Sequence, residues 1–257
     1  MSKNKFTFLV VVSVWLLVMA CGKGGSSTET KSTETNTTTS SSPAANNTST
    51  ETTPTITDSD VAGTYSVDGK GVDGSSYKGD LEVKKRDAVY QFSWKVGLEN
   101  YDGVGVQNGD KVAVAYTTGT DGKGCRAVIY KIGAGDTLEG KWGEWGVNQS
   151  GSEKAKPIGA LSGGTGKFEV EGANPDGSAY EGKLIITKGA NDVFQFAWDT
   201  AGSKYIGTGV KMGEFLAAGS GAKQCGFVIY EVKNGNLEGK WGVPGSTALG
   251  SEKATKK

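Results

Sequence analysis

Acidic side chains are the first candidates for chemistry in this chain, because its 257 residues include no histidine. Asp68 and Asp73 lie among glycines, as the ligands of a calcium loop do, but their spacing does not match D-x-D-x-D-G with a distal glutamate. A hairpin turn is the better interpretation of that stretch. Glu99, Asp102 and Asp110 raise the hypothesis of paired catalytic carboxylates. Nothing in the sequence sets them across a cleft, so we interpret them as solvated loop charges.

The overall composition restricts the function further. The missing histidine removes the commonest general base and the commonest zinc ligand. The three cysteines lack metal-site spacing, and no glycine-rich phosphate loop precedes a helical pattern. The 28 basic and 28 acidic residues balance, which gives no electrostatic attraction to nucleic acid. We therefore predict a protein that is not an enzyme and has no metal, no cofactor and no nucleic-acid partner.

Cys21 ends an apolar segment near the N-terminus. Two lysines precede the apolar run over 6–20, which is too short to cross a bilayer comfortably and is typical of a secretory signal peptide. The run ends in V-M-A-C-G over 18–22, which resembles a bacterial lipobox. The resemblance implies cleavage before Cys21 and diacylation at its thiol; the alternative is an ordinary signal peptide. We predict a lipoprotein signal peptide over 1–20 and a lipid anchor in the bacterial cell envelope, at the outer membrane.

Residues 21–59 are predicted to form a disordered tether behind the lipidated cysteine. Serine, threonine and asparagine dominate the segment, and it contains no aromatic residue. Such a chain cannot bury enough apolar surface to offset the entropy lost on ordering. A flexible tether of this length has a mean reach of roughly 30–35 Å, so it would hold a folded part away from a membrane.

The rest of the chain contains the same pattern twice. V-Y-Q-F-S-W over 89–94 corresponds to V-F-Q-F-A-W over 193–198, and L-E-G-K-W-G occurs at 138–143 and again at 237–242. A repeat of about 100 residues is a whole domain rather than a solenoid unit. We predict a first β-barrel repeat over 60–157 and a second over 158–257, joined by the piece P-I-G-A-L-S-G-G.

Each copy has the signals of about eight strands. Period-two alternation places Tyr90, Phe92 and Trp94 on one face of their strand, and that face is conserved in kind between the copies, so we assign it to the core. In the first copy the strands are expected near 63–68, 77–86, 88–96, 101–107, 110–117, 125–132, 137–143 and 152–155, separated by glycine, asparagine and aspartate turns. Closure into a barrel covers the apolar face of such a meander and removes its edges. The predicted fold is all-β, with two tandem small up-and-down β-barrels. One larger barrel merging both copies is the alternative, disfavoured because each copy repeats a complete core set.

Cys125 and Cys225 are equivalent in the two copies, each three residues before the valine of V-I-Y. One interpretation is a disulfide between the copies, which an exported chain could form. The other is two small buried hydrophobic residues. Alternation puts Cys125 on the same apolar face as Ala127 and Ile129, and we assign that face to the barrel interior. We therefore predict two free, protected thiols.

Trp145 breaks the symmetry of the repeat, because Pro244 stands at its counterpart. A tryptophan that the shared core does not need is a candidate binding residue, since exposed tryptophans are frequent interface anchors. Packing on the end of its own barrel or at the junction between domains is the alternative.

E-G-A-N-P-D-G-S-A-Y-E-G over 171–182 resembles the opening hairpin of small exported bacterial repeats labelled fibronectin-binding protein. Those repeats continue with five further motifs, which correspond in order to Phe194–Trp198, Gly207–Gly209, Val228–Tyr230, Leu237–Trp241 and Glu252. The first copy follows the same pattern, with Val72 in place of Pro175. The resemblance covers both domains and implies adhesin-like binding of a host matrix protein such as fibronectin.

The function predicted is therefore that of a membrane-anchored, non-enzymatic binding module whose partner is an extracellular matrix protein. The alternatives are a carrier of a small apolar ligand, as other up-and-down barrels are, and an inhibitor of a secreted hydrolase. A large apolar internal cavity would favour the carrier. A packed interior with an exposed aromatic patch would favour adhesion or inhibition.

Overall fold

The computed structural model of the protein describes residues 59–221 and 225–257. The predicted signal peptide over 1–20 and, apart from its last residue, the predicted tether over 21–59 lie outside these residues, and so does Cys21. Within the described part, no helix is both long enough and apolar enough to cross a membrane.

Sixteen strands form in the described residues, and those of the first copy begin close to the positions predicted from the alternation. In the first copy they are β1 (Gly63–Lys70), β2 (Ser76–Arg86), β3 (Val89–Val96), β4 (Glu99–Asn108), β5 (Lys111–Thr118), β6 (Cys125–Ile132), β7 (Leu138–Glu144) and β8 (Gly151–Ser162). In the second copy they are β9 (Thr165–Ala173), β10 (Ala179–Lys188), β11 (Val193–Thr200), β12 (Ser203–Met212), β13 (Phe215–Gly221), β14 (Gly226–Lys233), β15 (Asn236–Gly242) and β16 (Gly250–Lys256). Short 3-10 turns cover Ala134–Asp136 and Ala190–Asp192.

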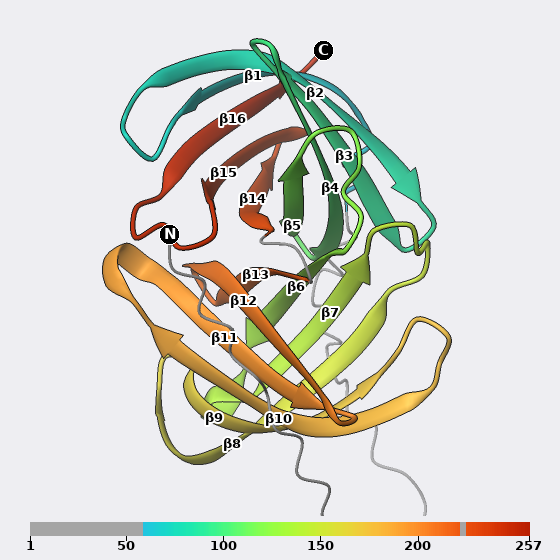
Figure 1. Ribbon diagram of the computed structural model, residues 1–257, viewed down its shortest axis with the longest axis vertical. Helices are drawn as coiled ribbons and strands as arrows, with labels where there is room; N and C mark the ends of the chain where they lie inside the picture. The colour runs from blue at the N-terminus through green and yellow to red at the C-terminus, as the bar shows by residue number, and fades with distance from the viewer. Residues whose placement is uncertain (1–58, 222–224) are drawn as a thin grey trace, which may run out of the picture. The chain divides into compact units, whose positions relative to one another are not determined.

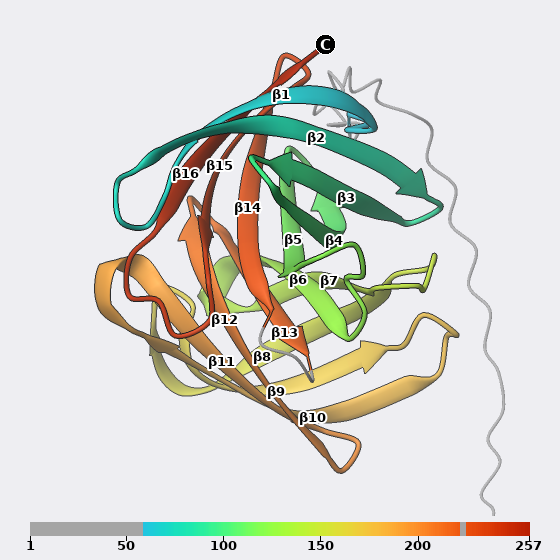
Figure 2. The ribbon, with the colours of Figure 1, turned by 45° about the horizontal axis from the view of Figure 1, so that its top comes forward.

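The strands close into two eight-stranded antiparallel barrels, which confirms the predicted fold class. Barrel A consists of β1–β5 and β14–β16, and barrel B consists of β6–β13. In Figure 1 the red strands β14–β16 accordingly lie beside the blue and green strands β1–β5, and Figure 2 shows the same grouping. Barrel B is thus one continuous segment inserted between β5 and β14 of barrel A.

This strand order corrects the predicted barrel boundaries at 60–157 and 158–257. Each copy contributes strands to both barrels: β5 pairs with β14, and β13 pairs with β6. The predicted joining piece is not a linker either, because β8 continues to Ser162 and pairs with β9, with a register shift between Ile158 and Ser162.

Equivalent strands of the two copies carry the same inward side chains. The alternation pattern therefore could not reveal that each barrel takes strands from both copies. Val128 and Tyr130 of β6 line the core of barrel B, and Val228 and Tyr230 of β14 line the core of barrel A. A strand from either copy therefore provides the inward side chains that either barrel needs. The insertion is also geometrically simple, because the two ends of barrel B are paired neighbours at Cys125 and Gly221. Closely spaced ends are what make domain insertion tolerable.

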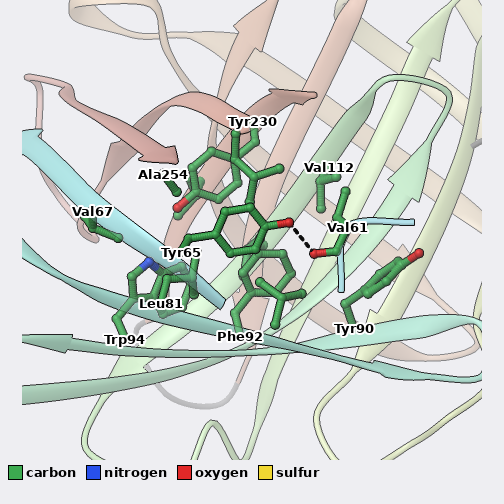
Figure 3. Close-up of a cluster of buried hydrophobic side chains, with 14 residues drawn as sticks. Val61, Tyr65, Val67, Leu81, Tyr90, Phe92, Trp94, Val112, Tyr230 and Ala254 are labelled. Atoms are coloured by element: carbon green, nitrogen blue, oxygen red, sulfur yellow. Dashed lines mark hydrogen bonds between the residues drawn. The ribbon is translucent and has the colours of Figure 1, made fainter. Parts of the chain in front are cut away.

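The interiors of both barrels are filled by the side chains that alternation assigned to the core. Tyr90, Phe92 and Trp94 are buried in barrel A, and Phe194, Phe196 and Trp198 are buried in barrel B. Figure 3 shows Tyr65 inside barrel A, where its hydroxyl donates a hydrogen bond to the carbonyl oxygen of Val61 at 2.6 Å.

A second apolar layer lies between the barrels. On β5, Val112 and Val114 face the interior of barrel A, whereas Ala113 and Ala115 belong to the layer that contacts barrel B. The layer comprises Val89, Val104, Val106, Ala113, Ala115, Cys125, Ala127, Ile129, Val193, Val210, Ala217, Cys225, Phe227 and Ile229. Strands β5, β6, β13 and β14 are therefore buried on both faces over most of their length.

Cys125 and Cys225 form a disulfide inside this layer, with a Cα–Cα distance of 5.9 Å. The prediction of two free thiols was wrong. Alternation placed Cys125 correctly with Ala127 and Ile129, but that apolar face packs between the barrels, not inside one. Cys125 begins the inserted segment, and Cys225 stands just before β14, where the chain returns to barrel A. The bridge therefore joins the two points at which the chain passes between barrels.

Replacing Trp198 by alanine should lower the free energy of unfolding by about 3–5 kcal/mol, because its ring is 7 % exposed and its loss leaves a cavity. Denaturant unfolding followed by circular dichroism measures the change. Ile185→Ala on the outer face of barrel B, where the side chain is 41 % exposed, is the control and should change stability by less than about 0.5 kcal/mol. Equal effects of the two substitutions would contradict the assignment of Trp198 to the core.

Candidate binding site at the mouth of barrel A

Each barrel buries one glutamate near an end. Glu252 of β16 is 8 % exposed in barrel A, and Glu153 of β8 is 5 % exposed in barrel B. Both come from the repeated pentapeptide G-S-E-K-A. A buried carboxyl group is costly unless donors surround it, and in both barrels aromatic side chains provide those donors.

In barrel A, Glu252 accepts hydrogen bonds from Tyr77 Oη at 2.8 Å, from Trp94 Nε1 at 3.1 Å and from the hydroxyl of Tyr230. Burial raises the pKa of Glu252, and the three donors oppose that rise because they stabilise the carboxylate. Burial and the nearby Glu252 also raise the pKa of Tyr77 and of Tyr230, so both phenols stay neutral donors at pH 7. The cluster can hold a negative charge at the wall of the barrel.

Barrel B repeats the cluster. Glu153 accepts hydrogen bonds from Tyr180 Oη at 2.9 Å, from Trp198 Nε1 at 3.3 Å and from the hydroxyl of Tyr130. Burial likewise raises the pKa of Glu153. One further bond closes this end, because Trp142 Nε1 donates to Tyr180 Oη at 3.1 Å.

In barrel A the tryptophan that corresponds to Trp142 is Trp241, and it closes the end of the barrel less completely. Trp241 meets Tyr77 edge-on, with ring centroids 6.1 Å apart. Its indole Nε1 is buried and makes no well-formed hydrogen bond to the described residues.

A cavity of about 500 Å³ opens at this end of barrel A, above Glu252, and we call it the mouth cavity. Six of its fifteen lining residues are aromatic, and among the described residues Asp73 and Glu252 are the only charged side chains that line it. The aromatic lining consists of Tyr77, Trp94, Tyr101, Tyr116, Tyr230 and Trp241. Deeper in the barrel the space is filled by fully buried rings such as Tyr65 and Phe92. The cavity is therefore confined to one end of a packed barrel.

The corresponding cavity in barrel B is smaller, about 200 Å³, and Arg126 extends across it. The guanidinium carbon lies 5.2 Å from the ring centroid of Trp142 and 4.8 Å from that of Tyr205. Arg126 also donates to Glu144 Oε2 from Nη2 at 2.8 Å and from Nε at 3.1 Å. Gly226 stands at the equivalent position of β14, so barrel A has no cation at this position.

The acidic candidates from the sequence have structural roles. Asp73 Oδ1 accepts hydrogen bonds from the backbone N–H of Ser75 at 3.0 Å and from its hydroxyl at 2.6 Å, as expected for the predicted hairpin turn. Asp68 is exposed and pairs with Lys78 at 3.5 Å. In the described part of the chain, no three potential metal-ligating side chains gather.

Glu99, Asp102 and Asp110 are not brought together at one site, but the interpretation of all three as solvated loop charges was wrong for Asp102, which is buried at 7 % exposure within a strand. Glu99 begins β4, Asp102 lies within it, and Asp110 follows its other end. Asp110 instead forms an ion pair with Lys111 at 2.7 Å.

Trp145 lies at the junction between the barrels and is half-buried. Its ring packs against Gly122 and against the layer that holds the disulfide, and its backbone N–H donates to the carbonyl oxygen of Cys125 at 3.0 Å. The structure therefore supports the packing interpretation of Trp145, and the ring is not the freely exposed anchor that the break in symmetry suggested.

Sequence reasoning did not identify the mouth cavity. Glu153 and Glu252 had a usable signal, because a glutamate sits at the same place in both copies of G-S-E-K-A although most surface charges differ. A second signal was the contrast between C-R-A-V-I-Y over 125–130 and C-G-F-V-I-Y over 225–230. It places an arginine and a glycine at equivalent positions of strands that are otherwise alike.

Comparisons with protein-family models, with curated proteins and with solved structures found no match to this chain.

Proposed function

We propose that this protein is a lipid-anchored, non-enzymatic binding protein of the bacterial cell envelope, and that it binds its ligand in the mouth cavity of barrel A. The observation that supports this most directly is the difference between two otherwise equivalent barrel ends. One is partly occupied by the protein's own Arg126, which leaves about 200 Å³, and the other is a cavity of about 500 Å³ with six aromatic side chains in its wall, within the usual size range of ligand sites.

The packed interior limits what the cavity can hold. Because rings fill the barrel below Glu252, the cavity suits a projecting group rather than a long apolar molecule enclosed along the barrel axis. The carrier of a small apolar ligand is therefore the weaker alternative. The extracellular matrix protein implied by the sequence resemblance, fibronectin among the examples, remains one candidate source of such a group and is included in the test.

Blocking the mouth cavity should abolish ligand binding. Val243 lines the cavity and is 38 % exposed, so Val243→Trp fills the entrance without disturbing the core. Saturation-transfer NMR with neutral, anionic and cationic fragments, and a pull-down with fibronectin, measure binding by the full chain. Ile206→Trp, at a position 76 % exposed and outside the cavity, is the matched control.

We expect ligands that bind the wild type and Ile206→Trp but not Val243→Trp. If every bound ligand is retained by Val243→Trp, or if none binds the wild type, the mouth cavity is not the binding site.

Anchoring rests on Cys21, which lies outside the described residues. Cys21→Ala should move the protein from the membrane fraction to the soluble fraction and abolish incorporation of labelled fatty acid, because two acyl chains anchor stably whereas a chain without them does not. Detergent partitioning and acyl labelling in the expressing bacterium measure this. Unchanged partitioning of the variant would exclude lipidation as the anchor.

A further inference from the structure

The two barrel ends form an internal comparison within one molecule. The aromatic positions around the cavities correspond: Trp241 to Trp142, Tyr101 to Tyr205, Tyr77 to Tyr180 and Trp94 to Trp198. The buried glutamates correspond as well. What one end holds therefore indicates what the other end is shaped to hold.

In barrel B the aromatic walls hold a cation. The guanidinium of Arg126 lies over Trp142 and Tyr205, and both distances are within the roughly 6 Å at which a ring face attracts a positive charge. Glu144 at the rim balances the charge through a pair of hydrogen bonds. The chain itself thus provides an example of the ligand chemistry that these walls accept.

Barrel A keeps the walls, but none of its described residues puts a cation in the place of Arg126. Gly226 replaces Arg126, Val243 replaces Glu144, and Tyr116 replaces Ser220. The Tyr116 ring leans across Gly226, where a Cβ atom would come within 2.3 Å of it, so the glycine is required for this placement. Tyr116 adds a further wall, since it lies 5.9 Å from Trp94 and 6.0 Å from Tyr101 by ring centroids.

The charges that line the mouth cavity have one sign. Asp73 and Glu252 are acidic, and no lysine or arginine is among the described residues that line the cavity. Barrel B, by contrast, has Arg126 together with Glu153 in its cavity. The aromatic faces and carboxyl groups of barrel A are complementary to a positive charge that no described residue supplies in this cavity.

We propose that the mouth cavity of barrel A binds an organic cation, a guanidinium or ammonium group carried by the ligand, in the place that Arg126 fills in barrel B. The inference rests on the proposed function, because it names the ligand class of the same cavity. Ring faces and a carboxylate at the base select the positive charge, and the absence of a rim acid at Val243 leaves the entrance open to the rest of the ligand.

Matched pairs of cations and neutral isosteres test the inference. N-acetylarginine amide is compared with N-acetylcitrulline amide, and choline with 3,3-dimethylbutan-1-ol, in NMR titrations of the full chain. We expect each cation to bind at least about tenfold more tightly than its neutral partner. The stronger of the two cations identifies the source as a guanidinium or as a quaternary ammonium group. Equal affinity within both pairs would overturn the inference.

Charge variants at an exposed position avoid the risk of misfolding. Val243→Lys should weaken binding of the preferred cation at least about tenfold by like-charge repulsion, whereas Val243→Glu should bind it as well as or better than the wild type. The same Lys and Glu changes at Ile206, away from the cavity, should leave the affinity unchanged. Loss of binding with both Val243→Lys and Val243→Glu would indicate a steric effect and overturn the inference.

Transplanting the arrangement of barrel B is the stronger version of the test. The triple variant Tyr116→Ser, Gly226→Arg and Val243→Glu gives barrel A the residues that hold Arg126 in barrel B, and it should no longer bind the cation.

The fragment-binding experiment with Val243→Trp distinguishes failure of the cation inference from failure of the proposed function. If neutral or anionic fragments bind and Val243→Trp abolishes their binding, the cavity is the site and the cation inference alone fails. If nothing is lost with Val243→Trp, both fail.

Discussion

Cutting the chain between β8 and β9 should leave the two halves bound to each other, even after the disulfide has been reduced. The cut at Gly163–Gly164 separates the two sequence copies, but each barrel contains strands of both. The pairs β1–β16, β5–β14, β6–β13 and β8–β9 all cross the cut. Separation would require both barrels to open, which amounts to unfolding.

The experiment inserts a site-specific protease sequence between Gly163 and Gly164, whose positive φ angles of 61° and 86° mark a turn. Turns of this kind tolerate insertion well. After cleavage and reduction in native buffer, size-exclusion chromatography should give one species with the mass of the uncut chain. Two tandem barrels, one from each copy, would separate into two smaller species, the fragments 1–163 and 164–257, and that elution would contradict the strand order described here.

Denaturation of the cut protein provides the control. In strong denaturant the reduced halves should separate, which shows that cleavage was complete and that folding, not a residual covalent link, holds the halves together. The inward residues of β6–β8 and β14–β16 are equivalent, so a separated half retains the pattern for closing a barrel of its own. Such closure would expose the apolar layer around Ala113 and Ile129, which the native arrangement buries.

Alternation predicted the strands well because it is a local property. Phe92, Trp94 and Trp198 lie inward as expected, and the strand limits agree within a few residues except at the β8–β9 hairpin. The choice of partner strand is not local. Val128 and Val228, or Tyr130 and Tyr230, offer the same side chain to a neighbouring strand, so sequence alone does not say which copy completes which barrel.

The strands at the junction contained a signal that alternation misses. V-A-V-A over 112–115 and V-I-Y over 228–230 are apolar on both faces, as expected for strands buried on both sides. For such strands the alternation of side chains identifies two apolar faces but does not show which of them faces the barrel interior. The assignment of Cys125 failed for this reason.

The mouth cavity was missed for another reason. It depends on Arg126 and Gly226 occupying equivalent places in different barrels. That relation becomes visible only after the side chains that line the two barrel ends are known.

Removing the Cys125–Cys225 bridge should cost about 4–5 kcal/mol in the free energy of unfolding. The bridge closes a loop with a sequence separation of 100 residues, which contains the whole of barrel B. In the chain-entropy account, a loop of about 100 residues restricts the unfolded state by about 4.7 kcal/mol at 25 °C. The cysteines lie in a packed apolar layer, so Cys125→Ala with Cys225→Ala avoids burying a new polar group.

Denaturant unfolding of the double variant in the Cys21→Ala background, followed by tryptophan fluorescence, measures this loss. The fold should persist, because the strand pairs and the apolar layer between the barrels do not depend on the bridge. Thiol labelling of the Cys21→Ala protein provides an independent check: no thiol should react in denaturant alone, and two should react once a reductant is added. Two thiols that react after unfolding without reductant would show that the bridge does not form, and in that case the double alanine variant should lose no more stability than a conservative change in a packed layer.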